Sequence, residues 1–171
     1  MKLTDILPLE EWIEFEKDIH KKSGLDVNVF DTEGIRISSY KKWVNKLCPV
    51  IKANDKGQAF ICAVAHMNIA AQAKHEKKAV IEECDAGLVK LVVPILVNKE
   101  FLGSVGACGL LLDDGEVDSF MINRTIEIEE EEIGSLSNGI AKITTEDAQL
   151  LAAYIQKQLD LIIEGLYQKR V

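Results

Sequence analysis

The segment that most constrains the fold is LVVPILVNKEFLGSVGACGLLLD, residues 91–113, in which two apolar runs flank the dipeptide Asn98-Lys99. Apolar runs of this length, rich in Val, Ile and Leu, predict buried strands. Asparagine tolerates the positive φ that a two-residue hairpin turn requires, although Asn-Lys is a weaker turn signal than Asn-Gly. We therefore expect a β-hairpin with strands over residues 88–97 and 100–112.

The second predicted strand is unusual because it contains three glycines, Gly103, Gly106 and Gly109, with Cys108 beside the last. Glycine weakens the interior of a strand unless another group must come close to its backbone. The strand is therefore expected either to pack tightly under another element or to line a pocket.

The rest of the chain predicts helices arranged around further strands. Apolar residues at helical spacing between Pro8 and Gly24 predict a first helix. The segments on either side of the turn DTEG read as strands and predict a hairpin. In chain order we expect a helix over 8–24, strands over 25–30 and 34–40, an irregular segment over 43–55, a helix over 57–75, a strand over 79–83, the hairpin, one or two short helices before Asn138, and a last helix from Thr144. Strands in one antiparallel sheet with helices around it define an α+β fold.

The last helix has two interpretations. Thr144 and Asp147 are spaced like a capping box, and the apolar residues that follow step by four and three, as in a short heptad seam. Leu151, Tyr154 and Ile163 widen this face beyond a strict seam. The helix either packs on its own domain or forms a dimer or signalling contact, and the pattern leaves both open.

Composition excludes several classes of function. The formal net charge is −8, which argues against direct nucleic-acid or anionic-membrane binding, since both need a basic surface. The chain has no apolar run near the ~20 residues that span a bilayer. The start, MKLTDILPLEEW, does not have the order of a signal peptide. We therefore expect a cytoplasmic protein, or a cytoplasmic part of a larger one, whose four cysteines do not form disulfides.

The cysteines and one histidine are the residues with the most chemical potential. Cys62 and His66 are four apart on a predicted helix, so both side chains leave the same face. Cys48 precedes this helix and Cys84 follows it, and a thiolate and imidazole set suits zinc or an iron–sulfur cluster. Because no CxxC pair is present, the alternative of buried apolar cysteines and a structural histidine stays open.

A catalytic interpretation has less support. His66 could act as a base for Cys62 or Cys84, but no nucleophile signature surrounds either cysteine. The sequence also contains no GxGxxG, Walker loop or HExxH motif. We therefore expect a protein that is not an enzyme, with a thiol redox switch or cysteine-dependent enzyme as the alternative.

Residues 84–111, CDAGLVKLVVPILVNKEFLGSVGACGLL, resemble the PocR-type ligand-binding domain, a sensory module of bacterial regulators. Cys48 and Cys62 fall where members of that family often carry cysteines, and the resemblance covers about residues 3–112. The matching residues are Cys84, Ala86, Gly87, Leu88, Pro94, Ile95, Leu102 and Gly103.

The resemblance implies a PAS- or GAF-like α+β fold, with a central antiparallel sheet, flanking helices and a ligand pocket on one face. It implies a cytoplasmic bacterial sensory domain over residues 1–140, with residues 141–171 forming a C-terminal helix for packing, dimerisation or signalling. Two departures from the family pattern, His66 and Cys108, add metal-binding side chains near the expected pocket. Strand register decides whether Gly106 and Cys108 face the helix that bears His66.

Two kinds of ligand follow from this hypothesis. A metal ion, iron–sulfur cluster or haem would use Cys48, Cys62, His66, Cys84 and Cys108. An organic ligand would instead contact Trp43, Phe60, Lys90 and Gly106. In either case the signal is expected to pass through the C-terminal helix to a second copy of the chain or to an output domain, without direct contact with nucleic acid or membrane.

Overall fold

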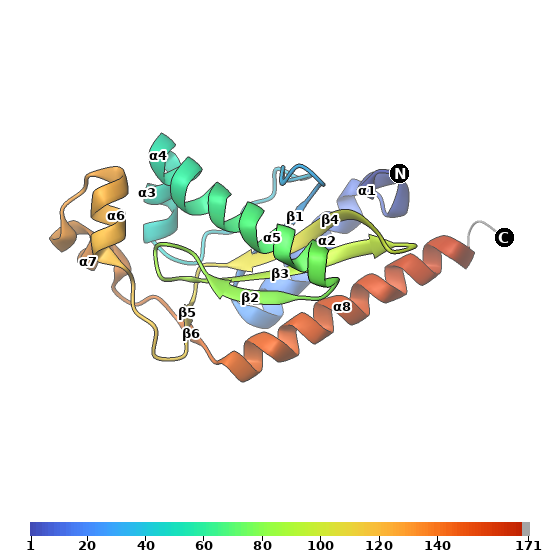
Figure 1. Ribbon diagram of the computed structural model, residues 1–171. Coiled ribbons are helices and arrows are strands. Elements are labelled where there is room, and N and C mark those ends of the chain that lie inside the picture. Colours follow the sequence, from blue (N-terminus) through green and yellow to red (C-terminus); the bar gives the residue numbers. More distant parts are fainter. Residues whose placement is uncertain (169–171) are drawn as a thin grey trace.

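The computed structural model describes residues 1–168 and has a four-stranded antiparallel sheet at its centre, with strand order β1-β4-β3-β2. The strands are β1 Asp26–Phe30, β2 Val80–Glu83, β3 Val89–Val97 and β4 Glu100–Cys108. Helices flank the sheet, and a long C-terminal helix runs beside it (Figure 1). The α+β fold expected from the order of elements is therefore confirmed.

The hairpin of β3 and β4 is confirmed, with a turn at Asn98 and Lys99, whose φ angles are 52° and 69°. Positive φ at both positions is the geometry that matches the twist of the flanking strands. The second strand ends at Cys108, earlier than expected. Residues Leu111–Leu112 instead form β5, which pairs in parallel with β6, Lys142–Ile143, in a separate two-stranded sheet.

The helices account for most of the remaining chain. They are α1 Leu3–Ile6, α2 Leu9–Ser23, α3 Leu47–Ala53, α4 Asp55–Gly57, α5 Val64–Glu76, α6 Ser119–Ile126, α7 Glu130–Ser137 and α8 Thr145–Gln168. A π-helical segment, η1 Gln58–Ala63, joins α4 to α5, so that the predicted helix over 57–75 is one rod with a wider turn inside it. The helix expected between Pro8 and Gly24 is α2, and it ends at Gly24 with φ 71°.

Two predictions of local structure were wrong. Residues 34–40 do not form a strand, because Arg36 makes only an isolated bridge to Phe30. The segment over 43–55, predicted to be irregular, contains α3. Pro49 is the third residue of that helix, where its missing N–H would have no partner within the helix anyway.

The two faces of the sheet pack against different elements. On one face, Val27 and Leu91 belong to a core that includes Trp12 of α2 and Ile155 and Leu159 of α8. Figure 1 shows α8 running along this side of the sheet while α5 crosses the other side. The buried residues of α8 are Ala148, Leu151, Ala152, Ile155, Leu159 and Leu166, so the helix packs on its own domain.

The other face of the sheet carries residues from alternate positions in each strand. Lys90, Cys108 and Asp26 form one row across β3, β4 and β1. In the neighbouring row, Val92 packs with residues of α5 and β2, while Gly106 lies beside it in β4. The helix covers only part of this face.

A second core lies at the end of the molecule where α3, α4, α6 and α7 gather (Figure 1). Leu47 and Ile51 of α3 and Ile122 of α6 are fully or almost fully buried there. None of the helices within residues 1–168 combines the length and the apolar character needed to cross a membrane.

Candidate functional site

A cavity of about 600 Å³ occupies the uncovered part of the sheet, between the strands and the rod formed by η1 and α5. Its wall is completed by the segment between β1 and α3 and by the turn after β2. Buried residues such as Asn28, Lys90 and Gly106 form its floor. The lining residues Ile35 and Met67 are both 59% exposed and therefore lie at its mouth.

Most of the residues singled out in the sequence meet in this cavity. The residues that line it are Trp43, Cys48, Cys62, His66, Cys84, Lys90, Gly106 and Cys108. Phe60 is the exception, because it is 63% exposed and is not part of the lining. Their roles in binding a ligand or a metal stay predictions.

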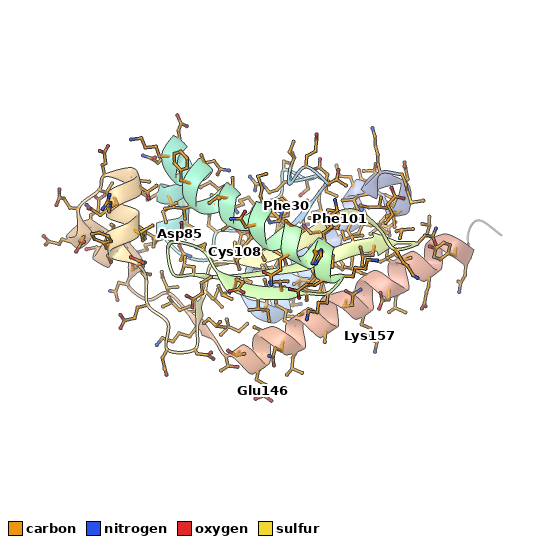
Figure 2. All side chains as sticks on the ribbon, viewed as in Figure 1. Phe30, Asp85, Phe101, Cys108, Glu146 and Lys157 are labelled. Carbon is orange, nitrogen blue, oxygen red and sulfur yellow. The ribbon has the colours of Figure 1, made fainter. Side chains whose placement is uncertain are left out.

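The register of β4 places Gly106 and Cys108 on the cavity side of the sheet. A Cβ atom on Gly106 would lie 2.9 Å from the ring of Phe30 and 3.5 Å from the ring of His66. Figure 2 labels Phe30, the last residue of β1, and Cys108, the last residue of β4. The absence of a side chain at position 106 therefore leaves room for the stacked rings of Phe30 and His66 and for the cavity beside them.

His66 projects from α5 onto the sheet and is only 4% exposed. Its ring stacks on Phe30 with a centroid separation of 3.7 Å. Burial, reinforced by the charges of Lys90 and Lys52, lowers its pKa to about 3, so the imidazole is neutral near pH 7. A neutral imidazole has one donor and one acceptor, and within residues 1–168 neither ring nitrogen has a hydrogen-bond partner.

Three of the thiols around the cavity, those of Cys48, Cys62 and Cys84, are protonated near neutral pH. Burial raises the pKa of Cys48 to about 12 and that of Cys84 to about 11, and it also raises the pKa of Cys62. These three side chains also pack against the second core, which is the role of a small apolar residue. The donor of one hydrogen bond to Cys48 Sγ is Asn45 Nδ2, at 3.3 Å.

The predicted metal centre has no ready-made geometry in this structure. Across the described residues 1–168, no group of three or more His, Cys, Asp or Glu side chains is placed to hold a metal ion. Thiols with raised pKa values must also lose protons before they can bind a metal. A metal, cluster or haem bound by these residues stays a prediction.

The cavity is more cationic than the protein as a whole, whose net charge is −8. Four cationic side chains line it, Arg36, Lys41, Lys52 and Lys90, against the two carboxylates of Asp26 and Glu33. Lys41 forms an ion pair with Asp26, whereas within the described chain Lys52 and Lys90 have no carboxylate within ion-pair distance. Burial lowers the pKa of Lys52, and the nearby charges of Lys41, Arg36 and Lys90 lower it further.

Several residues of the cavity were not identified from the sequence. They are Asp26, Asn28, Arg36, Lys52 and Gln58. Asp26 and Asn28 did give a signal, because polar residues at alternate positions of LDVNVF mark one face of a strand that is otherwise apolar. Arg36, Lys52 and Gln58 come from a loop and two helical segments, and only the tertiary fold brings them to the same place.

The comparison with protein families agrees with the resemblance seen in the sequence. A family model described as the sensory domain found in PocR matches residues 5–167. The match extends through most of α8, well past the residues 3–112 that carried the resemblance, and the division of the chain at residue 140 stays a prediction. No match to the chain is found among curated proteins. The chain belongs to the family of the sensory domain found in PocR.

Proposed function

We propose that this domain senses a small molecule that binds in the cavity between the sheet and α5, and that it signals without catalysing a reaction. The observation that carries the proposal is His66, whose two ring nitrogens lie buried in the cavity wall without a partner in the described chain. A buried polar group without a hydrogen bond costs about 1–3 kcal/mol. A ligand with a donor or acceptor at this point would remove that cost.

Neighbouring side chains of β3 point to opposite faces of the sheet, so this strand could carry a change in the cavity to α8. Lys90 faces the cavity, while its neighbour Leu91 belongs to the core that contains Ile155 and Leu159 of α8. A ligand that moves Lys90 therefore acts on a strand that α8 packs against. Such a ligand shifts the domain between two states only if it binds them unequally. We propose that α8 passes this change to a second copy of the chain or to an output domain.

A thermal-shift screen of small metabolites against the wild-type domain and Gly106→Val tests the proposal. The valine methyl groups would enter the space beside Phe30 and His66, so compounds that stabilise the wild type should not stabilise the variant. Gly134→Val is the matched control, because a Cβ at that exposed position of α7 meets no atom within 4 Å. The proposal fails if no compound raises the melting temperature, or if Gly106→Val responds as the wild type does.

A metal centre is the second candidate, and one observation favours it. Four thiols, from α3, η1, the turn after β2 and the end of β4, line the same cavity. We expect a metal-bound form to show stoichiometric zinc or iron, or the absorbance of a cluster or haem, after anaerobic purification. A colourless, metal-free protein whose melting does not change on adding zinc or iron would rule this candidate out.

A further inference from the structure

The floor of the cavity contains positive charge that the protein does not neutralise. Lys90 is only 8% exposed, and its Nζ lies 5.3 Å from the centroid of the Phe30 ring, on which His66 stacks. Lys52 lies close enough to His66 for its charge to disfavour protonation of the imidazole, and its charge also interacts with that of Lys90. Burying an ammonium group without a counter-charge is unfavourable, so this arrangement is suited to an anion supplied from outside the chain.

Asp26 does not serve as that counter-charge. It lies in the same row as Lys90, but Cys108 of β4 separates the two residues, and Asp26 Oδ2 is paired with Lys41 instead. Lys41 in turn lies 4.3 Å from the centroid of the Trp43 ring, towards the exposed side of the cavity. Within the described chain Arg36 has no carboxylate within ion-pair distance either, so the unneutralised charge lies on Arg36, Lys52 and Lys90, and the last two act on the unpartnered imidazole.

The mouth of the cavity has the opposite character. Ile35 and Met67 are 59% exposed and Trp43 is 41% exposed, and all three line the cavity. Apolar side chains left in water at the entrance gain from contact with an apolar group of a ligand. The cavity thus changes from cationic and polar at its floor to mainly apolar at its mouth, where Glu33 is an exposed charged residue of the lining.

We propose that the ligand is a small amphiphilic carboxylic acid, held with its carboxylate between Lys52, Lys90 and the ring N–H of His66, and with its apolar part directed towards Ile35, Trp43 and Met67. This proposal rests on the proposed function and adds the chemical class of the ligand. A carboxylic acid fits better than a phosphate, because it joins an anion that suits the cationic floor to an apolar chain that suits the side chains at the mouth. The shared charge of the two classes makes inorganic phosphate a necessary comparison.

Isothermal titration calorimetry with straight-chain monocarboxylates from acetate to octanoate tests the proposal, with the alcohols of the same length and inorganic phosphate in parallel. We expect affinity to rise with chain length until the cavity is filled. We also expect each carboxylate to bind at least about tenfold more tightly than its alcohol, as one charged hydrogen bond would give. Tighter binding of phosphate than of any carboxylate would overturn the choice of class.

Two variants test which residues hold the carboxylate. Lys52→Gln and Lys90→Gln should each weaken carboxylate binding by about tenfold and leave the binding of alcohols unchanged. Lys157→Gln, on the outer face of α8 (Figure 2), is the matched control and should change neither. If Lys90→Gln does not fold, Lys52→Gln still decides the question, because Lys52 is only half-buried.

The outcomes separate this inference from the proposed function. If carboxylates do not bind, or bind no better than alcohols, the inference is overturned. A compound of another class that stabilises the wild type but not Gly106→Val would then leave the proposed function in place. If no compound of any class stabilises the wild type, both fail.

Discussion

His66 is buried, neutral and without a hydrogen-bond partner within residues 1–168. Its low pKa, about 3, should make the free energy of unfolding depend on pH. Between that value and the ordinary histidine pKa of about 6.5, the unfolded chain binds a proton that the folded domain does not. The free energy of unfolding should therefore fall as the pH falls through this window.

We expect lowering the pH from 7 to 5 to remove about 1–2 kcal/mol of stability in the wild type through His66. His66→Phe retains an aromatic ring next to Phe30 and should lose this part of the pH dependence. Urea unfolding at both pH values measures the difference, with the exposed His75→Gln as the control that keeps it. Equal pH dependence in the wild type and His66→Phe would show that the imidazole ionises normally.

The cavity thiols give a second prediction for single residues. Because burial raises the pKa of Cys48 to about 12 and of Cys84 to about 11, thiolates are scarce near pH 7.5. Both cysteines should react with iodoacetamide at least about tenfold more slowly than a free model thiol, as measured by peptide mapping. Reaction of Cys84 faster than the model thiol would instead favour the redox-switch or cysteine-enzyme alternative.

Most of the residues singled out from the sequence line the cavity, but they form only part of its lining, and the sequence did not show why they matter. Cys62 and His66 share a helix face, and Gly106 and Cys108 share a strand face, so local periodicity groups each pair. The cationic character of the floor depends on Lys52 and Arg36, whose positions follow from the packing of α3 and of the loop after β1. No local pattern encodes that packing.

At the scale of elements, the buried carboxylate of Glu16 connects α2 to the cavity wall. Val29 N donates to Glu16 Oε1 at 2.7 Å, and Ser38 Oγ donates to Glu16 Oε2 at 2.9 Å. These bonds join α2 both to β1 and to the segment that follows it, which lines the cavity. Burial raises the pKa of Glu16, although both hydrogen bonds oppose this shift.

Glu16→Ala should lower the free energy of unfolding by about 2–4 kcal/mol, because it leaves the Val29 N–H without its acceptor and removes the bond to Ser38. Glu16→Gln can accept from Val29 N through its amide oxygen and donate from its amide nitrogen to Ser38 Oγ, and it should therefore cost much less. Urea unfolding measures the effect, and hydrogen exchange over residues 31–46 should be faster in Glu16→Ala alone. Glu14→Ala, which removes a surface pair with Lys17, is the control. A loss in Glu16→Ala no larger than in this control would contradict the role of the buried carboxylate.

The packing of α8 against the sheet predicts different effects for substitutions on its two faces. Leu159 is fully buried in the core shared with the sheet, whereas Leu161 is 52% exposed. Leu159→Ala should cost about 2–5 kcal/mol of stability, and Leu161→Ala should change it by less than about 0.5 kcal/mol. Chemical unfolding of dilute protein measures both. A small effect of Leu159→Ala would mean that the seam of α8 faces a partner and not its own domain.

Elements with strong local signals were predicted well, and those set by tertiary context were not. The hairpin turn at Asn98 and the end of α2 at Gly24 both use a residue that tolerates positive φ, which the sequence displays directly. The segment over 34–40 alternates like a strand, yet only Arg36 bridges to Phe30. The π-helical turn at Gln58–Ala63 has no sequence signature, although such turns often occur at functional sites.

At the scale of the whole molecule, a sheet buried on both faces connects the cavity to α8. One face of β3 carries Lys90 into the cavity, and the other carries Leu91 and Val93 into the core beneath α8. The second core, on α3, α6 and α7, holds the end of the cavity where Cys48 and Cys84 lie. A ligand at the proposed site would contact Cys48 and Cys84, which pack on the second core, and Lys90, whose strand packs on the first core.

The most direct test is a nitrogen-15 NMR titration of histidine-labelled protein with the compound that stabilises the domain most. If the ligand completes the cavity, the Nδ1 or Nε2 signal of His66 shifts on binding as it gains a hydrogen-bond partner, while the signals of the exposed His75 do not move. His66→Phe identifies the resonances. His66 signals that stay unchanged when the compound is saturating would contradict the claim that this cavity is the sensory site.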